Sequence, residues 1–129
     1  MKKKILIIED NEQNMYMLTY LLESNNYQVM QAFTGADGIR VAKESLPDAI
    51  LLDIQLPEMD GYAVARNLRS IRELDTVPII AVTSYAMVGD REKVMESGAD
   101  GYIEKPIDPD TFIQQMETIL VEKRNSQHD

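Results

Sequence analysis

Five short apolar runs alternate with longer stretches of helical spacing, and this alternation constrains the fold more than any other feature of the sequence. Strands that alternate with helices form parallel sheets, because each right-handed crossover places its helix on a face of the sheet. The run Ala49–Leu52 is apolar at every position, as expected of a strand buried on both faces. The pattern predicts a doubly wound α/β domain. Its predicted strands are Ile5–Ile8, Val29–Ala32, Ala49–Leu52, Pro78–Val82 and Tyr102–Ile103.

Capping residues mark the ends of the intervening helices. Thr34 begins a capping-box pattern that opens the second helix, and Asp60 is a favourable N-cap for the third. The fourth helix is predicted at about residues 87–97, with Gly98 ending it. The fifth is predicted with Asp108 as its N-cap and Pro109 in its first turn.

The composition excludes several classes of site and partner. A chain of 129 residues with 44% apolar content suits one domain, predicted over residues 1–124 and followed by a polar tail at 125–129. The chain has no cysteine, and its one histidine, His128, lies in that tail, so thiolate, zinc and histidine-based sites are not expected. The net charge of -9 argues against direct binding of nucleic acid or anionic lipid. Without a membrane-spanning run or a signal-peptide pattern, the protein is expected to be cytoplasmic.

Polar residues follow four of the predicted strands at their carboxyl ends. Glu9 and Asp10 follow the first strand, Asp53 the third, Thr83 the fourth and Lys105 the fifth. In the strand order 2-1-3-4-5 the first and third strands are neighbours, so three carboxylates converge on one crevice. Because uncompensated carboxylates repel one another, a hard divalent cation is expected there, and Mg²⁺ suits ligands that are all oxygens. Mn²⁺ is a possible substitute on the same ligands.

The same strand ends carry the groups that phosphoryl transfer requires. Lys105 supplies a positive charge and Thr83 a hydroxyl donor for the equatorial oxygens of a phosphoryl group. Asp53 is then the nucleophile, which attacks phosphorus in line and becomes an aspartyl phosphate. The pattern therefore predicts phosphoryl chemistry that needs no histidine of its own.

Four motifs occur in order at these strand ends. They are residues 7–11 (IIEDN), 52–61 (LDIQLPEMDG), 82–84 (VTS) and 98–106 (GADGYIEKP). Together they resemble the CheY-like receiver domain of two-component response regulators, of the stand-alone, single-domain type. The resemblance covers about residues 3–120 and implies a flavodoxin-like (βα)5 fold, with a parallel five-stranded sheet in the order 2-1-3-4-5.

The resemblance implies a metal site and a site of modification. Asp53 corresponds to the phosphoacceptor of the family and to one ligand of Mg²⁺. Asp10 corresponds to a direct metal ligand, and Glu9 to a residue that acts on the metal through water. The backbone carbonyl of Gln55 corresponds to a further metal ligand.

The resemblance also implies a switch. Thr83 corresponds to the switch hydroxyl, Lys105 to the cation that binds the phosphate, and Tyr102 to the aromatic switch residue. Lys105-Pro106 resembles the cis peptide of the family, which would aim the lysine inward. For Tyr102 the alternative is simple half-buried packing, because a tyrosine has an apolar body and a polar tip.

The implied function is signalling rather than enzymatic turnover of a substrate. A sensor histidine kinase or a histidine phosphotransfer domain would donate the phosphoryl group to Asp53. The phosphate would attract Thr83 and Lys105, let Tyr102 rotate inward, and change the face formed by the fourth helix, fifth strand and fifth helix. We expect a downstream protein partner there, no direct contact with nucleic acid or membrane, and a monomer or weak homodimer.

Two other functions use a similar fold. A phosphatase of the haloacid dehalogenase type needs a second carboxylate two residues after its nucleophile, where this chain has Gln55. A flavodoxin-like FMN binder needs hydroxyls and backbone amides after the first strand, where residues 10–14 are acidic and amidic. Both are disfavoured.

Tyr85, two residues after Thr83, is placed to screen an acyl phosphate from water and so to lengthen its lifetime.

Overall fold

A five-stranded parallel sheet forms the centre of the structure, a computed structural model that describes residues 2–57, 59–84 and 89–127. In chain order the elements are β1 (Lys4–Ile8), α1 (Glu12–Ser24), β2 (Gln28–Ala32), α2 (Gly35–Ser45), β3 (Ala49–Asp53), α3 (Gly61–Arg69), the 3-10 helix η1 (Arg72–Leu74), β4 (Ile79–Thr83), α4 (Asp90–Glu96), β5 (Gly101–Glu104) and α5 (Phe112–Gln127). The strand order is β2-β1-β3-β4-β5, and every neighbouring pair is parallel. The predicted fold and strand order are confirmed.

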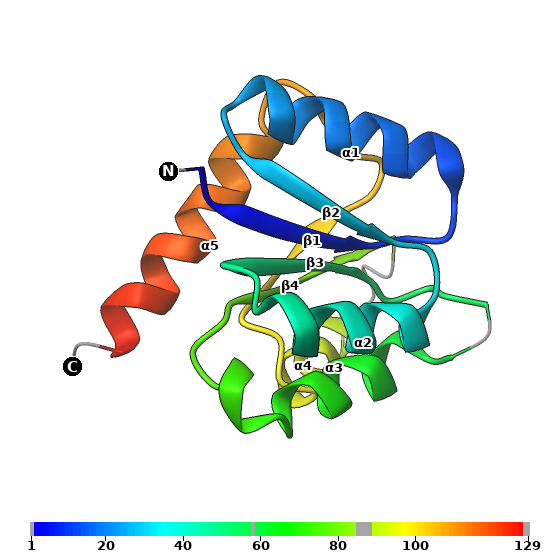
Figure 1. Cartoon of the computed structure of the whole chain (residues 1–129), viewed down its shortest axis with the longest axis vertical. Coiled ribbons are helices and arrows are strands. Elements are labelled where there is room, and N and C mark those ends of the chain that lie inside the picture. Colours follow the sequence, from blue (N-terminus) through cyan, green and yellow to red (C-terminus); the bar gives the residue numbers. More distant parts are fainter. Residues whose placement is uncertain (1, 58, 85–88, 128–129) are drawn as a thin grey trace.

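Helices cover both faces of the sheet and close two apolar cores. One face carries α1 and α5, and the other carries α2, α3 and α4 (Figure 1). Successive side chains of a strand point to opposite faces, so in β1 Ile5 and Ile7 pack with α1 and α5. Leu6 and Ile8 pack with the other three helices. All five residues of β3 are buried, which places this strand at the centre of the domain.

Hydrogen bonds at the helix ends confirm the predicted caps of α2 and α3. Thr34 Oγ1 accepts a hydrogen bond from the backbone N–H of Asp37 at 3.1 Å, and Asp60 Oδ1 accepts one from Tyr62 at 3.0 Å. Gly98 follows α4 with a φ of 110°, a left-handed conformation that glycine adopts without a steric penalty. These local signals are sufficient because each involves residues within one turn of the chain.

Of the last two helices, α5 begins later than predicted. For α4, the predicted residues 87–88 lie outside the described part of the chain. α5 begins at Phe112 rather than directly after Asp108, because residues 109–111 form a turn in which the Asp108 carbonyl accepts the Phe112 N–H at 3.0 Å. The helix then continues through residues 125–127, which the prediction assigned to the tail. In the described ranges, no helix is long and apolar enough to cross a membrane.

The strand order brings the carboxyl ends of β1, β3 and β4 together at one edge of the sheet. Leu52 of β3 pairs with Ile8 of β1 on one side and with Ala81 of β4 on the other. The next residue, Asp53, therefore ends the central strand between the two neighbouring strand ends. This edge is where doubly wound folds place their ligands.

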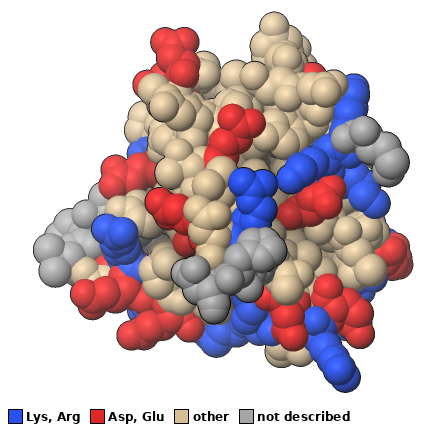
Figure 2. Space-filling model, turned by 90° about the vertical axis from the view of Figure 1, so that its left-hand side faces the viewer, with Lys and Arg blue, Asp and Glu red and all other residues tan. Residues whose placement is uncertain are grey.

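A charged network occupies the opposite edge, where the strands begin. Arg69 of α3 donates hydrogen bonds to the backbone carbonyls of Leu74, Asp75, Val77 and Gly98. It also pairs with Asp100 at 2.9 Å, and the same carboxylate pairs with Lys123 of α5. Figure 2 shows this end of the molecule, on which basic and acidic side chains are interleaved. The network ties α3 and α5 to the start of β5.

Candidate functional site

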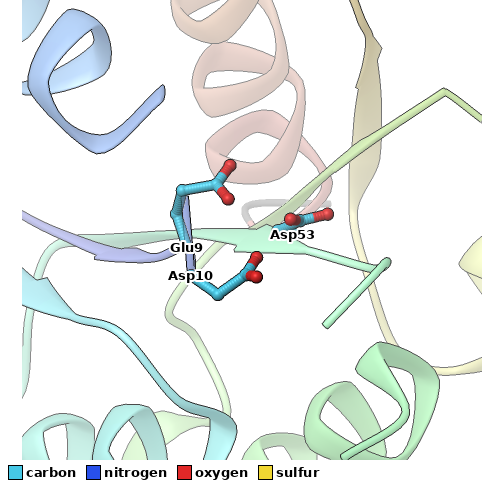
Figure 3. A group of neighbouring side chains, drawn as sticks. All are labelled: Glu9, Asp10 and Asp53. Carbon is cyan, nitrogen blue, oxygen red and sulfur yellow. The ribbon is translucent and has the colours of Figure 1, made fainter. Parts of the chain in front are cut away.

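Three carboxylates meet at the carboxyl ends of β1 and β3. Glu9 and Asp10 follow β1 directly, and Asp53 is the last residue of β3. Because these strands are hydrogen-bonded neighbours, one carboxylate oxygen from each residue lies within 4.8 Å of the others. Figure 3 shows the three side chains gathered around one space. Glu9 and Asp53 are buried, at 1% and 3% exposure, whereas Asp10 is exposed.

Lys105 is the cation that faces this cluster. Its Nζ lies 3.2 Å from Asp53 Oδ2 and 3.5 Å from Glu9 Oε1. The backbone N–H of Lys105 donates to the Thr83 carbonyl at 2.9 Å, which ties the chain after β5 to the end of β4. The Lys105-Pro106 peptide bond is cis, as predicted. A single lysine thus lies against two buried carboxylates.

Glu9 carries the clearest electrostatic perturbation. Burial raises the pKa of Glu9 from 4.5 to about 7, and the neighbouring charge of Asp53 adds to this effect. A hydrogen bond from the Asn11 backbone N–H to Oε2, 3.1 Å long, opposes the rise, as does the charge of Lys105. Within the described residues, the buried Oε1 atom accepts no hydrogen bond. The site therefore has one buried carboxylate oxygen that faces Lys105 Nζ at 3.5 Å without accepting a hydrogen bond from it.

The donor set fits a hard divalent cation. Mg²⁺ prefers carboxylate and carbonyl oxygens and is commonly held by one or two carboxylates, with water completing its shell. Glu9, Asp10 and Asp53 offer three such groups, and the exposed position of Asp10 leaves room for water. The unsatisfied oxygen of Glu9 is also what a cation or its bound water would satisfy. The position of the Gln55 carbonyl relative to this cluster stays a prediction.

A bridge of two hydrogen bonds joins Gln55 to Ser84 beside Asp53. The backbone N–H of Gln55 donates to Asp53 Oδ1 at 2.8 Å. The side-chain carbonyl oxygen of Gln55 accepts two hydrogen bonds from Ser84, one from the backbone N–H at 2.9 Å and one from Oγ at 2.8 Å. The sequence marked both positions as neighbours of the site, but nothing in it indicated that they bind each other. Thr83, which precedes Ser84, is fully buried at the end of β4.

Tyr102 lies on β5, and β4 separates this strand from β3, which carries Asp53. Its side chain is half-buried against the core shared by α2, α3 and α4. The guanidinium carbon of Arg91 on α4 lies 5.8 Å from the centre of its ring, which is within range of a cation–π contact. The sequence analysis did not identify Arg91. Tyr85 and His128 lie outside the described residues.

The sequence of this chain resembles those of known proteins. The family described as response regulator receiver domain matches residues 5–117. The chain is 41% identical over 120 residues to the polar-differentiation response regulator DivK of Brucella ovis, covering 93% of this chain and 98% of that protein.

Solved structures show the same fold. The receiver domain of the sensor histidine kinase PA1611 from Pseudomonas aeruginosa, which has a magnesium ion coordinated in its active site cleft, is 33% identical with a TM-score of 0.84. The match covers 93% of this chain and 98% of that one. The chemotaxis protein CheY4 of Vibrio cholerae matches with a TM-score of 0.88 at 23% identity, covering 92% and 99% of the two chains. The chain therefore belongs to the receiver domains of two-component response regulators.

Proposed function

We propose that this domain accepts a phosphoryl group on Asp53 from a sensor histidine kinase or a histidine phosphotransfer domain, and then signals to a protein partner. The observation that carries the proposal is the contact between Lys105 Nζ and Asp53 Oδ2, 3.2 Å apart, beside two further carboxylates. A half-buried lysine and a carboxylate nucleophile beside a candidate metal site are the parts that phosphoryl transfer requires.

The transfer step is a displacement at phosphorus. A carboxylate oxygen of Asp53 forms a bond to phosphorus while the bond from phosphorus to the donor's histidine nitrogen breaks. The departing imidazole keeps the electron pair of that bond and takes up a proton from solvent. Lys105 is placed to neutralise charge on the phosphoryl oxygens, because it already pairs with the carboxylate that is modified. In hydrolysis, water attacks phosphorus, the Asp53 carboxylate is restored and inorganic phosphate leaves.

We propose that Glu9, Asp10 and Asp53 hold Mg²⁺, with the Gln55 backbone carbonyl as a further ligand and Mn²⁺ as a possible substitute. When bound, the ion would offset negative charge on the transferred group. The protein's own part is to keep the three carboxylates within 4.8 Å of one another before the ion arrives. The similarity to the receiver domain of PA1611, whose cleft holds magnesium, supports this assignment.

The signal would travel through Thr83 and Tyr102 to the face formed by α4, β5 and α5. The Thr83 hydroxyl lies on the residue after Val82, which pairs with Asp53 in the sheet, so it is close to the modified side chain. Tyr102 is half-buried, with Arg91 of α4 over its ring, so an inward rotation of the ring would loosen its contact with that helix. The haloacid dehalogenase alternative is disfavoured because Gln55 cannot act as a general acid, and its side chain is bound to Ser84.

The test is to incubate the full chain with acetyl phosphate and Mg²⁺ and to measure its intact mass. We expect a single phosphoryl adduct in the wild type and none in Asp53→Asn. Asp37→Asn, a change to an exposed carboxylate on α2, is the matched control and should keep the adduct. Absence of the adduct in the wild type, or its persistence in Asp53→Asn, would refute the proposal.

A further inference from the structure

The bridge between Gln55 and Ser84 occupies two hydrogen-bond donors at the mouth of the phosphorylation site. Both the backbone N–H and the hydroxyl of Ser84 point to one acceptor atom, Gln55 Oε1, at 2.9 and 2.8 Å. Gln55 itself is held against the nucleophile, because its backbone N–H donates to Asp53 Oδ1 at 2.8 Å. One residue therefore contacts both the carboxylate to be modified and the first residue after β4.

The sheet register places Ser84 close to that carboxylate. Asp53 pairs with Val82, and the backbone N–H of Ile54 donates to the Val82 carbonyl at 3.1 Å. Ser84 is two residues further along, at the point where the chain leaves β4. Its donors therefore lie on the same edge of the sheet as the Asp53 carboxylate.

A phosphoryl group on Asp53 adds three strong acceptor oxygens at this edge. Lys105 already faces the Asp53 carboxylate, and the two donors of Ser84, which bind Gln55, lie at the same edge of the sheet. A charged acceptor forms stronger hydrogen bonds than the neutral amide oxygen of glutamine. The phosphoryl oxygens and Gln55 Oε1 therefore compete for the same donors.

We propose that Gln55 is a positioning residue that acts as an internal competitor of the phosphoryl group. In the unmodified domain its side chain holds Ser84 directly after β4. Modification of Asp53 then requires this bridge to open, so part of the binding free energy of the phosphoryl group is used to displace Gln55. This inference rests on the proposed function and adds to it a residue that sets how readily the phosphorylated state forms.

The test measures binding of beryllofluoride, an analogue of a phosphoryl group, to the full chain in the presence of Mg²⁺ by isothermal titration calorimetry. Gln55→Met keeps the length of the side chain and the backbone N–H to Asp53 but removes the acceptor oxygen. We expect it to bind beryllofluoride about tenfold more tightly than the wild type, because two competing hydrogen bonds are gone. Gln114→Ala, on the exposed surface of α5, is the matched control and should bind like the wild type.

A double-mutant cycle separates competition for Ser84 from a general effect of the Gln55 substitution. Ser84→Ala removes one of the two donors, so the gain from Gln55→Met should be smaller in that background. Equal affinity of Gln55→Met and the wild type, or an equal gain in both backgrounds, would overturn the competition while leaving phosphorylation of Asp53 intact. Failure of the wild type to bind beryllofluoride or to form an adduct would overturn both proposals.

Discussion

Replacing Glu9 by glutamine should change how the stability of the domain depends on pH. The pKa of Glu9 is about 7 in the folded protein and near 4.5 in the unfolded chain. Between these values the folded state binds more protons than the unfolded state, so stability falls as pH rises. The contribution of Glu9 is therefore most favourable at low pH, declines from about pH 4.5 and levels off above about pH 7.

The size of the effect follows from the two pKa values. Between pH 5 and pH 8, ionisation of Glu9 should lower the free energy of unfolding of the metal-free wild type by roughly 2 to 3 kcal/mol relative to Glu9→Gln. Because Glu9 is only 1% exposed, solvent screening reduces this value little. Glu9→Gln should thus unfold at a clearly higher urea concentration than the wild type at pH 8, and the two should differ far less at pH 5.

The assay is urea denaturation followed by far-UV circular dichroism, in the presence of a chelator, at a series of pH values. Glu44→Gln, which changes an exposed glutamate on α2, is the matched control and should follow the wild type. Excess Mg²⁺ should narrow the difference between wild type and Glu9→Gln at pH 8, because a bound cation favours the charged carboxylate. Parallel pH profiles for wild type and Glu9→Gln, or a difference that grows toward low pH, would refute the reasoning.

Two further substitutions test contacts that stabilise the fold around the site. Arg69→Met should lower the free energy of unfolding by about 3 kcal/mol in thermal or urea denaturation, because it removes the guanidinium that binds four backbone carbonyls and Asp100. Arg40 forms only exposed ion pairs on α2, so the control Arg40→Met should cost less than about 0.5 kcal/mol, and equal losses in the two variants would contradict this. Gly61→Ala should lower the free energy of unfolding by about 2 kcal/mol, because its Cβ would lie 2.3 Å from the Cα of Ile54. An unchanged urea midpoint in Gly61→Ala would show that this close approach is not needed.

The fold was predictable because its signals are local or periodic. The apolar run at 49–52 indicated a strand buried on both faces, and the structure places β3 at the centre of the sheet. Thr34 and Asp60 indicated helix starts because a cap is a hydrogen bond to an N–H two or three residues away. The predicted start of α5 was wrong for a related reason. Asp108 caps a turn, and the sequence does not distinguish such a turn from the first turn of a helix.

Part of the site was predictable because the strand order brings distant residues to one edge. Glu9, Asp10 and Asp53 follow strands that the pattern already placed side by side, so their approach required no knowledge of side-chain packing. The same argument anticipated that Lys105 would face them. The roles of these residues in metal binding and phosphoryl transfer are predictions, and the adduct experiment tests the role of Asp53.

The alternating pattern and the residues at the strand ends were enough to predict a doubly wound domain with a carboxylate cluster and a lysine at the carboxyl edge of its sheet. Packing in three dimensions sets how the neighbouring side chains pair: Ser84 with Gln55, and Arg91 with the ring of Tyr102. It also decided the pKa of Glu9, which depends on burial by elements far apart in the chain. The physical reason is that strand and helix signals repeat along the chain, whereas these contacts depend on distances across space that no periodic pattern encodes.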